Sequence, residues 1–153
     1  MNANDKQHSI DVAVPVRVAY DQWTQFEEFP MFMNGVSSIT QLDDEHLRWV
    51  VDIAGVTREF DTTITEQTPD ERIAWTTSSG PTHAGVVTFH AIDDGTTRVT
   101  LQMDFEPEGF LENVGDKLGF VTGRLAGDMK NFKAFIEDES RSTGAWRGTI
   151  ENN

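Results

Sequence analysis

The sequence contains no cysteine, which excludes disulfide bonds, a thiol nucleophile and any zinc site built on thiolates. It also lacks a run of 18 consecutive apolar residues, so we expect no membrane-spanning helix. Residues 1–16 show no basic segment followed by an apolar one, as a signal peptide would. We therefore expect a cytoplasmic protein.

Basic residues are scarce as well. The 153 residues include 12 lysines and arginines against 26 aspartates and glutamates, which gives a formal net charge of −14. So acidic a surface repels the phosphates of nucleic acids and the headgroups of anionic lipids, and we expect neither as a partner. The acidic excess has two interpretations: adaptation to a salty cytoplasm, where ions screen the self-repulsion, or an ordinary acidic protein.

Apolar residues, in contrast, are sufficient for a folded core. Hydrophobic residues make up 37% of the chain, and ten of them are Phe and four are Trp. This composition argues against disorder, and the length suits one domain. We expect a single domain over residues 1–139 and a C-terminal tail over residues 140–153. Trp146 in this tail is expected to dock onto the body or onto a second subunit, and the latter would give a homodimer.

The residue pattern predicts short helices near the start, followed by a run of strands. A strand over residues 7–14 ends at Pro15, and apolar residues at helical spacing predict a helix over residues 15–26. A second helical turn is expected after a break at Pro30. Over residues 36–106 apolar and polar residues alternate between turn signals, which predicts antiparallel strands, about seven with the first.

The last predicted element is a long amphipathic helix over residues 111–138. Apolar residues recur in it at steps of three and four. At 1.5 Å per residue this helix is about 40 Å long, which is enough to cross a sheet. The concave face of the predicted sheet is the apolar surface on which it can lie.

Several segments fit one known pattern: Val14-Pro15, residues 23–33 (WTQFEEFPMFM), residues 85–89 (GVVTF), residues 97–101 (TRVTL) and the final helix. Together with the order of the elements, they resemble the START-like (SRPBCC) superfamily of polyketide cyclases, dehydrases and lipid-transport proteins, including its coenzyme Q-binding branch. The resemblance implies the α+β helix-grip fold: a curved antiparallel sheet of about seven strands, two short helices after strand 1, and a long C-terminal helix across the sheet. It also implies a cavity between sheet and helix that holds hydrophobic small molecules.

The side chains expected to face this cavity are rich in aromatic rings and methionine, which suit rings or acyl chains. For any one of them an ordinary core position is the alternative, and the cavity is favoured by the set taken with the fold. The predicted ligand-binding residues are Phe32, Met33, Trp49, Phe60, Trp75, Phe89, Met103, Phe105, Leu118, Gly119, Thr122 and Met129.

Four glycines stand at intervals of four on the predicted final helix: Gly115, Gly119, Gly123 and Gly127. Each glycine costs about 1 kcal/mol relative to alanine in a helix interior. The functional interpretation is a helix face left bare beside a bulky ligand. The structural interpretation is close packing against strand aromatics such as Trp49 or Trp75, or a slight bend of the helix.

The sequence offers few candidates for chemistry. Its four histidines show no helical metal-binding spacing, so neither a metal site nor a cofactor is predicted. Glu66 and Arg58 share strand parity with Phe60 and are therefore expected on the inward face, and His83 stands near a strand start. Glu66, His83 and Arg58 are the catalytic candidates. For Arg58 the alternative role is an ion pair with a nearby glutamate.

Two functions from different classes fit these features. Binding of a hydrophobic small molecule, such as a lipid, a quinone or a polyketide-like aromatic, needs only apolar walls. A polyketide cyclase or aromatase, which catalyses aldol cyclisation and dehydration, needs in addition an inward acid or base and an oxyanion partner. We expect the binding function, and the cyclase-like enzyme is the alternative.

Overall fold

The computed structural model describes residues 5–33, 35–53, 56–79, 83–105, 117–139 and 142–150, and the side chains of 7–33, 35–52, 57–78, 84–103, 126–138 and 142–150 among them. The elements follow in the order β1 (Asp5–Val12), α1 (Val16–Trp23), the 3-10 helix η1 (Phe26–Met31), β2 (Val36–Gln41), β3 (His46–Ile53), β4 (Val56–Thr68), β5 (Arg72–Ser79), β6 (His83–Asp93), β7 (Thr96–Phe105) and α3 (Lys117–Glu139).

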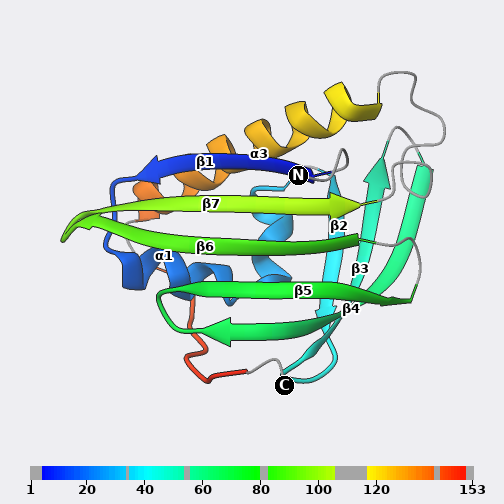
Figure 1. The fold of residues 1–153 in the computed structure, drawn as a ribbon, viewed down its shortest axis with the longest axis horizontal. Coiled ribbons are helices and arrows are strands. Elements are labelled where there is room, and N and C mark those ends of the chain that lie inside the picture. The colour runs from blue at the N-terminus through cyan, green and yellow to red at the C-terminus, as the bar shows by residue number, and fades with distance from the viewer. Residues whose placement is uncertain are drawn as a thin grey trace.

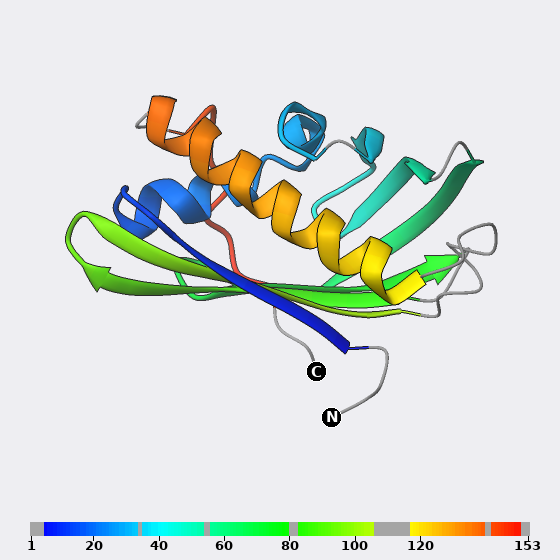
Figure 2. The ribbon, with the colours of Figure 1, turned by 90° about the horizontal axis from the view of Figure 1, so that it is seen from above.

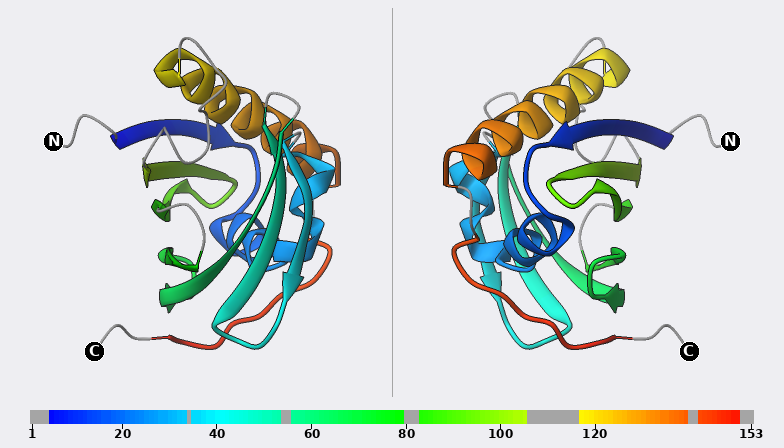
Figure 3. Two further views of the ribbon diagram at one scale, coloured as in Figure 1. Left: turned by 90° about the vertical axis from the view of Figure 1, so that its right-hand side faces the viewer. Right: turned by 90° about the vertical axis from the view of Figure 1, so that its left-hand side faces the viewer.

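Seven strands form one antiparallel sheet in the order β1-β7-β6-β5-β4-β3-β2. The sheet curves so that β2, β3 and β4 turn away from the plane of the other strands (Figures 1 and 3). Both α1 and α3 lie on the concave side, and α3 crosses the sheet obliquely (Figure 2). This arrangement confirms the helix-grip fold that the sequence predicts.

The alternation of side chains along the strands places one apolar face inside. In β3, Leu47 and Trp49 are buried while Arg48 between them is exposed. In β7, Val99 and Leu101 are buried and Gln102 is exposed. Because side chains of a strand point alternately to the two faces, this pattern gives an apolar concave face and a polar convex one. Helix α3 contributes Met129, Phe132 and Ile136, which are buried at steps of three and four.

The two short helices after β1 differ in detail from their prediction. Helix α1 ends at Trp23 and not at residue 26, because Thr24 turns the chain and its hydroxyl donates to the Asp21 carbonyl at 2.6 Å. The expected break at Pro30 is wrong, since Pro30 lies inside η1. A helix of six residues has few internal hydrogen bonds to lose, and the fixed φ of proline suits a 3-10 turn.

The C-terminal half of α3 is fastened to the end of β1 by polar contacts. The Lys133 ammonium donates to the Asp11 carbonyl at 2.8 Å and to the Glu137 carboxylate at 2.6 Å. The backbone N–H of Ala13 donates to the same carboxylate at 2.8 Å. The hydrogen bond from Lys133, with that from Ala13, holds the pKa of Glu137 below its usual value.

This lowered pKa predicts a pH dependence of stability. Because the pKa of Glu137 is lower in the folded chain, its ionised carboxylate stabilises the fold above the ordinary value of 4.5. That contribution is lost as the pH falls through the folded value. In Glu137→Gln we therefore expect a smaller decrease of the free energy of unfolding between pH 7 and pH 3 than in the wild type, measured by urea unfolding. Parallel curves for the two proteins would contradict this assignment.

Candidate functional site

The interior between the concave sheet face and the helices is built around Trp23 at the end of α1. The Trp23 ring lies 5.1 Å from Phe29, 6.0 Å from Phe32 and 5.3 Å from Phe132 of α3, measured between ring centroids. These contacts are tilted or edge-to-face, which is the favourable geometry for aromatic pairs. The aromatic residues of segment 23–33 therefore join α1, η1 and α3 into one wall of the interior.

Packing among the described residues leaves a small cavity of about 10 Å³. A water molecule needs about 10–15 Å³ for its centre, so this space is of the size of one water. A larger guest fits here only if a wall moves. The side chains that line the cavity are Trp23, Phe26, Phe29, Leu47, Trp49, Ile64, Ile73, Trp75 and Val87.

The strand side of this cavity is formed by large rings held in fixed positions. The rings of Trp49 and Phe60 stack at 5.8 Å with an interplanar angle of 14°, and the Trp49 indole N–H donates to the buried Thr62 hydroxyl at 2.9 Å. The Trp75 indole lies against the backbone of Gly85, where a Cβ atom would overlap the ring. Glycine at position 85 thus lets the indole lie flat on the sheet.

Most of the predicted ligand-binding residues whose side chains are described lie in the apolar core. Buried in the apolar core are Phe32, Met33, Trp49, Phe60, Trp75, Phe89 and Met129, and Met103 is half-buried against the same core. The side chains of Phe105, Leu118, Gly119 and Thr122 lie outside the described residues. Of the predicted set, Trp49 and Trp75 line the 10 Å³ cavity itself.

Gly127 is the one member of the glycine series on α3 whose surroundings are described. It is exposed, and a Cβ atom added to it would meet nothing within 4 Å. Close packing against strand aromatics is therefore wrong for this position. The surroundings of Gly115, Gly119 and Gly123 lie outside the described part of the chain.

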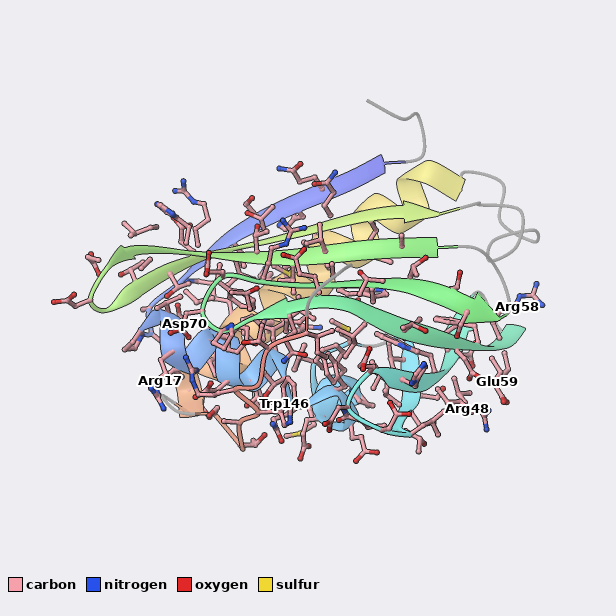
Figure 4. The ribbon with its side chains drawn as sticks, turned by 60° about the horizontal axis from the view of Figure 1, so that its bottom comes forward. Arg17, Arg48, Arg58, Glu59, Asp70 and Trp146 are labelled. Carbon is pink, nitrogen blue, oxygen red and sulfur yellow. The ribbon has the colours of Figure 1, made fainter. Side chains whose placement is uncertain are left out.

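Arg58 has the same strand parity in β4 as the buried Phe60, and its side chain projects beyond the end of the sheet (Figure 4). It is paired across the sheet with Val51, two residues from the buried Phe60, and its Nε atom is buried. Glu59, its neighbour on the opposite face, has its carboxylate 3.8 Å from the guanidinium of Arg48. Figure 4 shows Arg58 at the end of the sheet far from Trp146. The structure thus places this cation at one end of the sheet.

Glu66 does not lie on the inward face, and the parity argument is wrong for it. A β-bulge between Ile64 and Glu66 shifts the register of β4 against β5, so that Gln67 is buried instead. The Glu66 carboxylate lies 3.3 Å from the Arg72 guanidinium at a half-exposed site. The third catalytic candidate, His83, has its side chain outside the described residues.

The described part of the chain shows neither a metal-binding cluster nor a membrane-spanning helix. No group of three or more His, Asp or Glu side chains in it is arranged to hold a metal ion. Within the same residues, no helix is long and apolar enough to cross a membrane.

Residues 142–150 form a strap that passes along α1 to the β4–β5 turn (Figure 3). The Thr143 N–H donates to the Gln22 side-chain oxygen at 2.8 Å, and the Trp146 N–H donates to the Thr24 hydroxyl at 3.0 Å. Ile150 pairs with the backbone of Gln67 through two hydrogen bonds of 2.8 and 2.9 Å. The strap is therefore docked onto the body of the same chain.

Arg147 is the centre of this strap. Its guanidinium pairs with the Asp21 carboxylate of α1 and, at 2.8 Å, with the Asp70 carboxylate of the β4–β5 turn. It also lies over the Tyr20 ring at 5.4 Å from the centroid. Burial raises the pKa of the Tyr20 hydroxyl, which keeps this phenol neutral. Sequence reasoning named Trp146 as the anchor and missed Arg147, because no local signal connects it with its two partners.

The sequence profile of the family described as polyketide cyclase/dehydrase and lipid transport matches residues 12–134. An uncharacterised 17.2 kDa protein from Streptomyces lincolnensis is 56% identical over 145 residues, which cover 94% of this chain and 97% of that protein.

Two solved structures show the same fold at low sequence identity. The Zhui aromatase/cyclase from Streptomyces sp. R1128 superposes with a TM-score of 0.74 at 16% identity, over 93% of this chain and 98% of that one. A START superfamily protein from Mycobacterium smegmatis superposes with a TM-score of 0.69 at 14% identity, over 89% of this chain and 96% of that one.

Proposed function

Because the chain belongs to the polyketide cyclase/dehydrase and lipid-transport family, we propose that it binds a hydrophobic small molecule in the interior between the concave face of the sheet and the helices. The observation that carries the proposal is the chemistry of the cavity wall. All nine side chains that line the 10 Å³ cavity are aromatic or aliphatic. Such a wall stabilises an apolar guest by removing its surface from water, and it offers no acid or base for a reaction.

The small volume of this cavity requires that the wall adapts to the guest. Met33 and Met129 lie in the same core, and Met103 packs against it. Methionine has three rotatable bonds and a polarisable sulfur, so it changes its shape at little cost. The guest thus enters by displacing flexible side chains, while the hydrogen-bonded strands keep their register.

The cyclase-like enzyme is the second candidate, and Arg58 is the observation that favours it. A guanidinium at the end of β4, on a residue with inward strand parity, suits an enolate or carboxylate oxygen, which a cyclisation reaction develops. The likeness in fold to an aromatase/cyclase is consistent with such a role. The bulge that turns Glu66 away from the interior removes one of the expected acid–base partners.

Native mass spectrometry of the gently extracted protein tests the binding function. We expect an additional mass of a few hundred daltons that is lost on organic extraction. The extracted protein is then titrated with N-phenyl-1-naphthylamine, a neutral apolar probe. If no molecule co-purifies with the protein and this probe does not bind, the proposal is contradicted.

Two variants with the same chemical change locate the site. Leu47→Phe enlarges a buried side chain of the cavity wall, so we expect probe affinity to fall about tenfold, which corresponds to about 1.4 kcal/mol. Leu42→Phe makes the same change at an exposed position after β2 and is expected to leave the affinity unchanged. Equal affinities of the two variants would place the probe elsewhere.

A further inference from the structure

The indole nitrogen of Trp23 is a buried donor without an acceptor among the described residues. The Trp23 side chain is 1% exposed, and the rings around it are those of Phe29, Phe32 and Phe132, which carry no hydrogen-bond acceptor of ordinary strength. A buried polar group that exchanges its hydrogen bond to water for none in the protein lowers the stability of the fold by about 1–3 kcal/mol. Such a group in a native protein calls for a physical explanation.

A comparison with Trp49 shows that the chain does satisfy such donors elsewhere in the same wall. Both indoles line the 10 Å³ cavity. The N–H of Trp49 donates to the hydroxyl of Thr62, which is itself buried and stands on the neighbouring strand. Among the described residues, Trp23 on the helical side has no such threonine, so its N–H is a donor available to a group that arrives from outside the chain.

We propose that Trp23 donates a hydrogen bond to the bound guest, and that the guest is therefore an apolar molecule with a neutral acceptor oxygen, such as a ketone or quinone carbonyl. This inference rests on the proposed binding function. A hydrocarbon without a polar atom leaves the indole N–H unpaired and therefore gains no binding free energy from it. An ionised carboxylate is disfavoured against the aromatic wall around Trp23, because a single neutral donor does not compensate the loss of its hydration.

The aromatic surroundings favour a flat, conjugated guest over a flexible chain. A ring that enters beside Trp23 meets the faces and edges of Phe29 and Phe32, which pair favourably with other rings. A carbonyl on such a ring lies in the ring plane and reaches the edge of a neighbouring indole. The ligand class is thus a cyclic, conjugated ketone.

The test uses two flat probes with the same fused-ring skeleton: 1,4-naphthoquinone, which carries two carbonyl groups, and naphthalene, which carries none. The absence of cysteine removes the usual thiol adducts of the quinone. Trp23→Phe keeps an aromatic ring and deletes the N–H. We expect it to weaken binding of the quinone about fivefold, the effect of about 1 kcal/mol for one hydrogen bond, and to change binding of naphthalene less than twofold. Trp146→Phe, the same change in the strap, is the control and leaves both affinities as they are.

The possible outcomes separate this inference from the proposed function. If the wild type binds neither probe, the binding function fails. If it binds both and Trp23→Phe weakens both equally, the binding function stands and the hydrogen bond from Trp23 is refuted. Should the variant fold poorly, the wild type labelled with ¹⁵N at its indoles gives the answer. We expect the indole proton of Trp23 to move downfield with the quinone and not with naphthalene, and equal shifts would overturn the proposal.

Discussion

Replacing Phe132 by alanine is expected to lower the free energy of unfolding by about 3–5 kcal/mol, the usual cost of deleting a buried ring. Phe132 is fully buried and is the residue of α3 whose ring meets both Trp23, at 5.3 Å, and Phe32, at 5.2 Å. Its removal leaves a cavity at the junction of three helices. Because sheet and helices relax only partly around such a space, the loss exceeds the transfer free energy of the ring alone.

Phe135 provides the matched control for this prediction. It lies one turn further along α3, is half-buried, and meets Phe32 at 5.7 Å. Phe135→Ala is expected to cost clearly less than Phe132→Ala in urea unfolding at equal conditions. Equal losses of the free energy of unfolding in the two variants would contradict this prediction, as would a loss of less than about 1 kcal/mol in Phe132→Ala. In either case Phe132 is not the main packing contact between α3 and the interior.

Replacing Arg147 by methionine is expected to cost about 2–3 kcal/mol, as for hydrogen bonds to charged groups. Methionine keeps much of the apolar stem and removes the charge. The Asp21 carboxylate, whose side chain is 10% exposed, then loses its closest cation, and Asp70 loses its partner at 2.8 Å. A charge left without its partner in a largely buried place is what makes such a substitution costly. Chemical unfolding followed by far-UV circular dichroism measures the loss.

Two further variants isolate the origin of that loss. Arg17 approaches the same Asp21 carboxylate from solvent, at 3.9 Å and with a side chain 68% exposed, so Arg17→Met is expected to cost only about 0–1 kcal/mol. The positions of Arg17, Asp70 and Trp146 are shown in Figure 4. Adding Asp21→Asn to Arg147→Met should restore part of the lost stability, because the unpaired charge is removed. A double variant less stable than Arg147→Met alone would contradict the role assigned to this ion pair.

The fold could be predicted because its information is local. The alternation of Leu47 and Trp49 with Arg48 places them on opposite faces whichever strand lies next to them. The helical spacing of Met129, Phe132 and Ile136 likewise identifies the buried side of α3 without knowledge of the sheet. The order of such elements along the chain then favours one architecture.

The site could be predicted only in part, because its decisive features arise from pairing between distant segments. The bulge at Glu66 depends on how β4 pairs with β5, and no feature of the β4 sequence announces it. Arg147 finds its partner Asp21 126 positions away. Whether the Trp23 N–H has an acceptor depends on the residues that surround the ring in the fold. The aromatic content of the sequence predicts an apolar wall, but it does not predict the hydrogen bonds within that wall.

The strap also has a consequence for how the chain matures during synthesis. The guanidinium that holds α1 belongs to residue 147, and the lysine and glutamate that fasten β1 belong to residues 133 and 137. A ribosome delivers α1 and β1 long before these partners, so these contacts form only after residues 133 to 147 have emerged. Contacts of such sequence separation slow folding. Premature termination near residue 140 would therefore release a chain whose sheet is complete but whose first helix lacks the ion pair between Asp21 and Arg147.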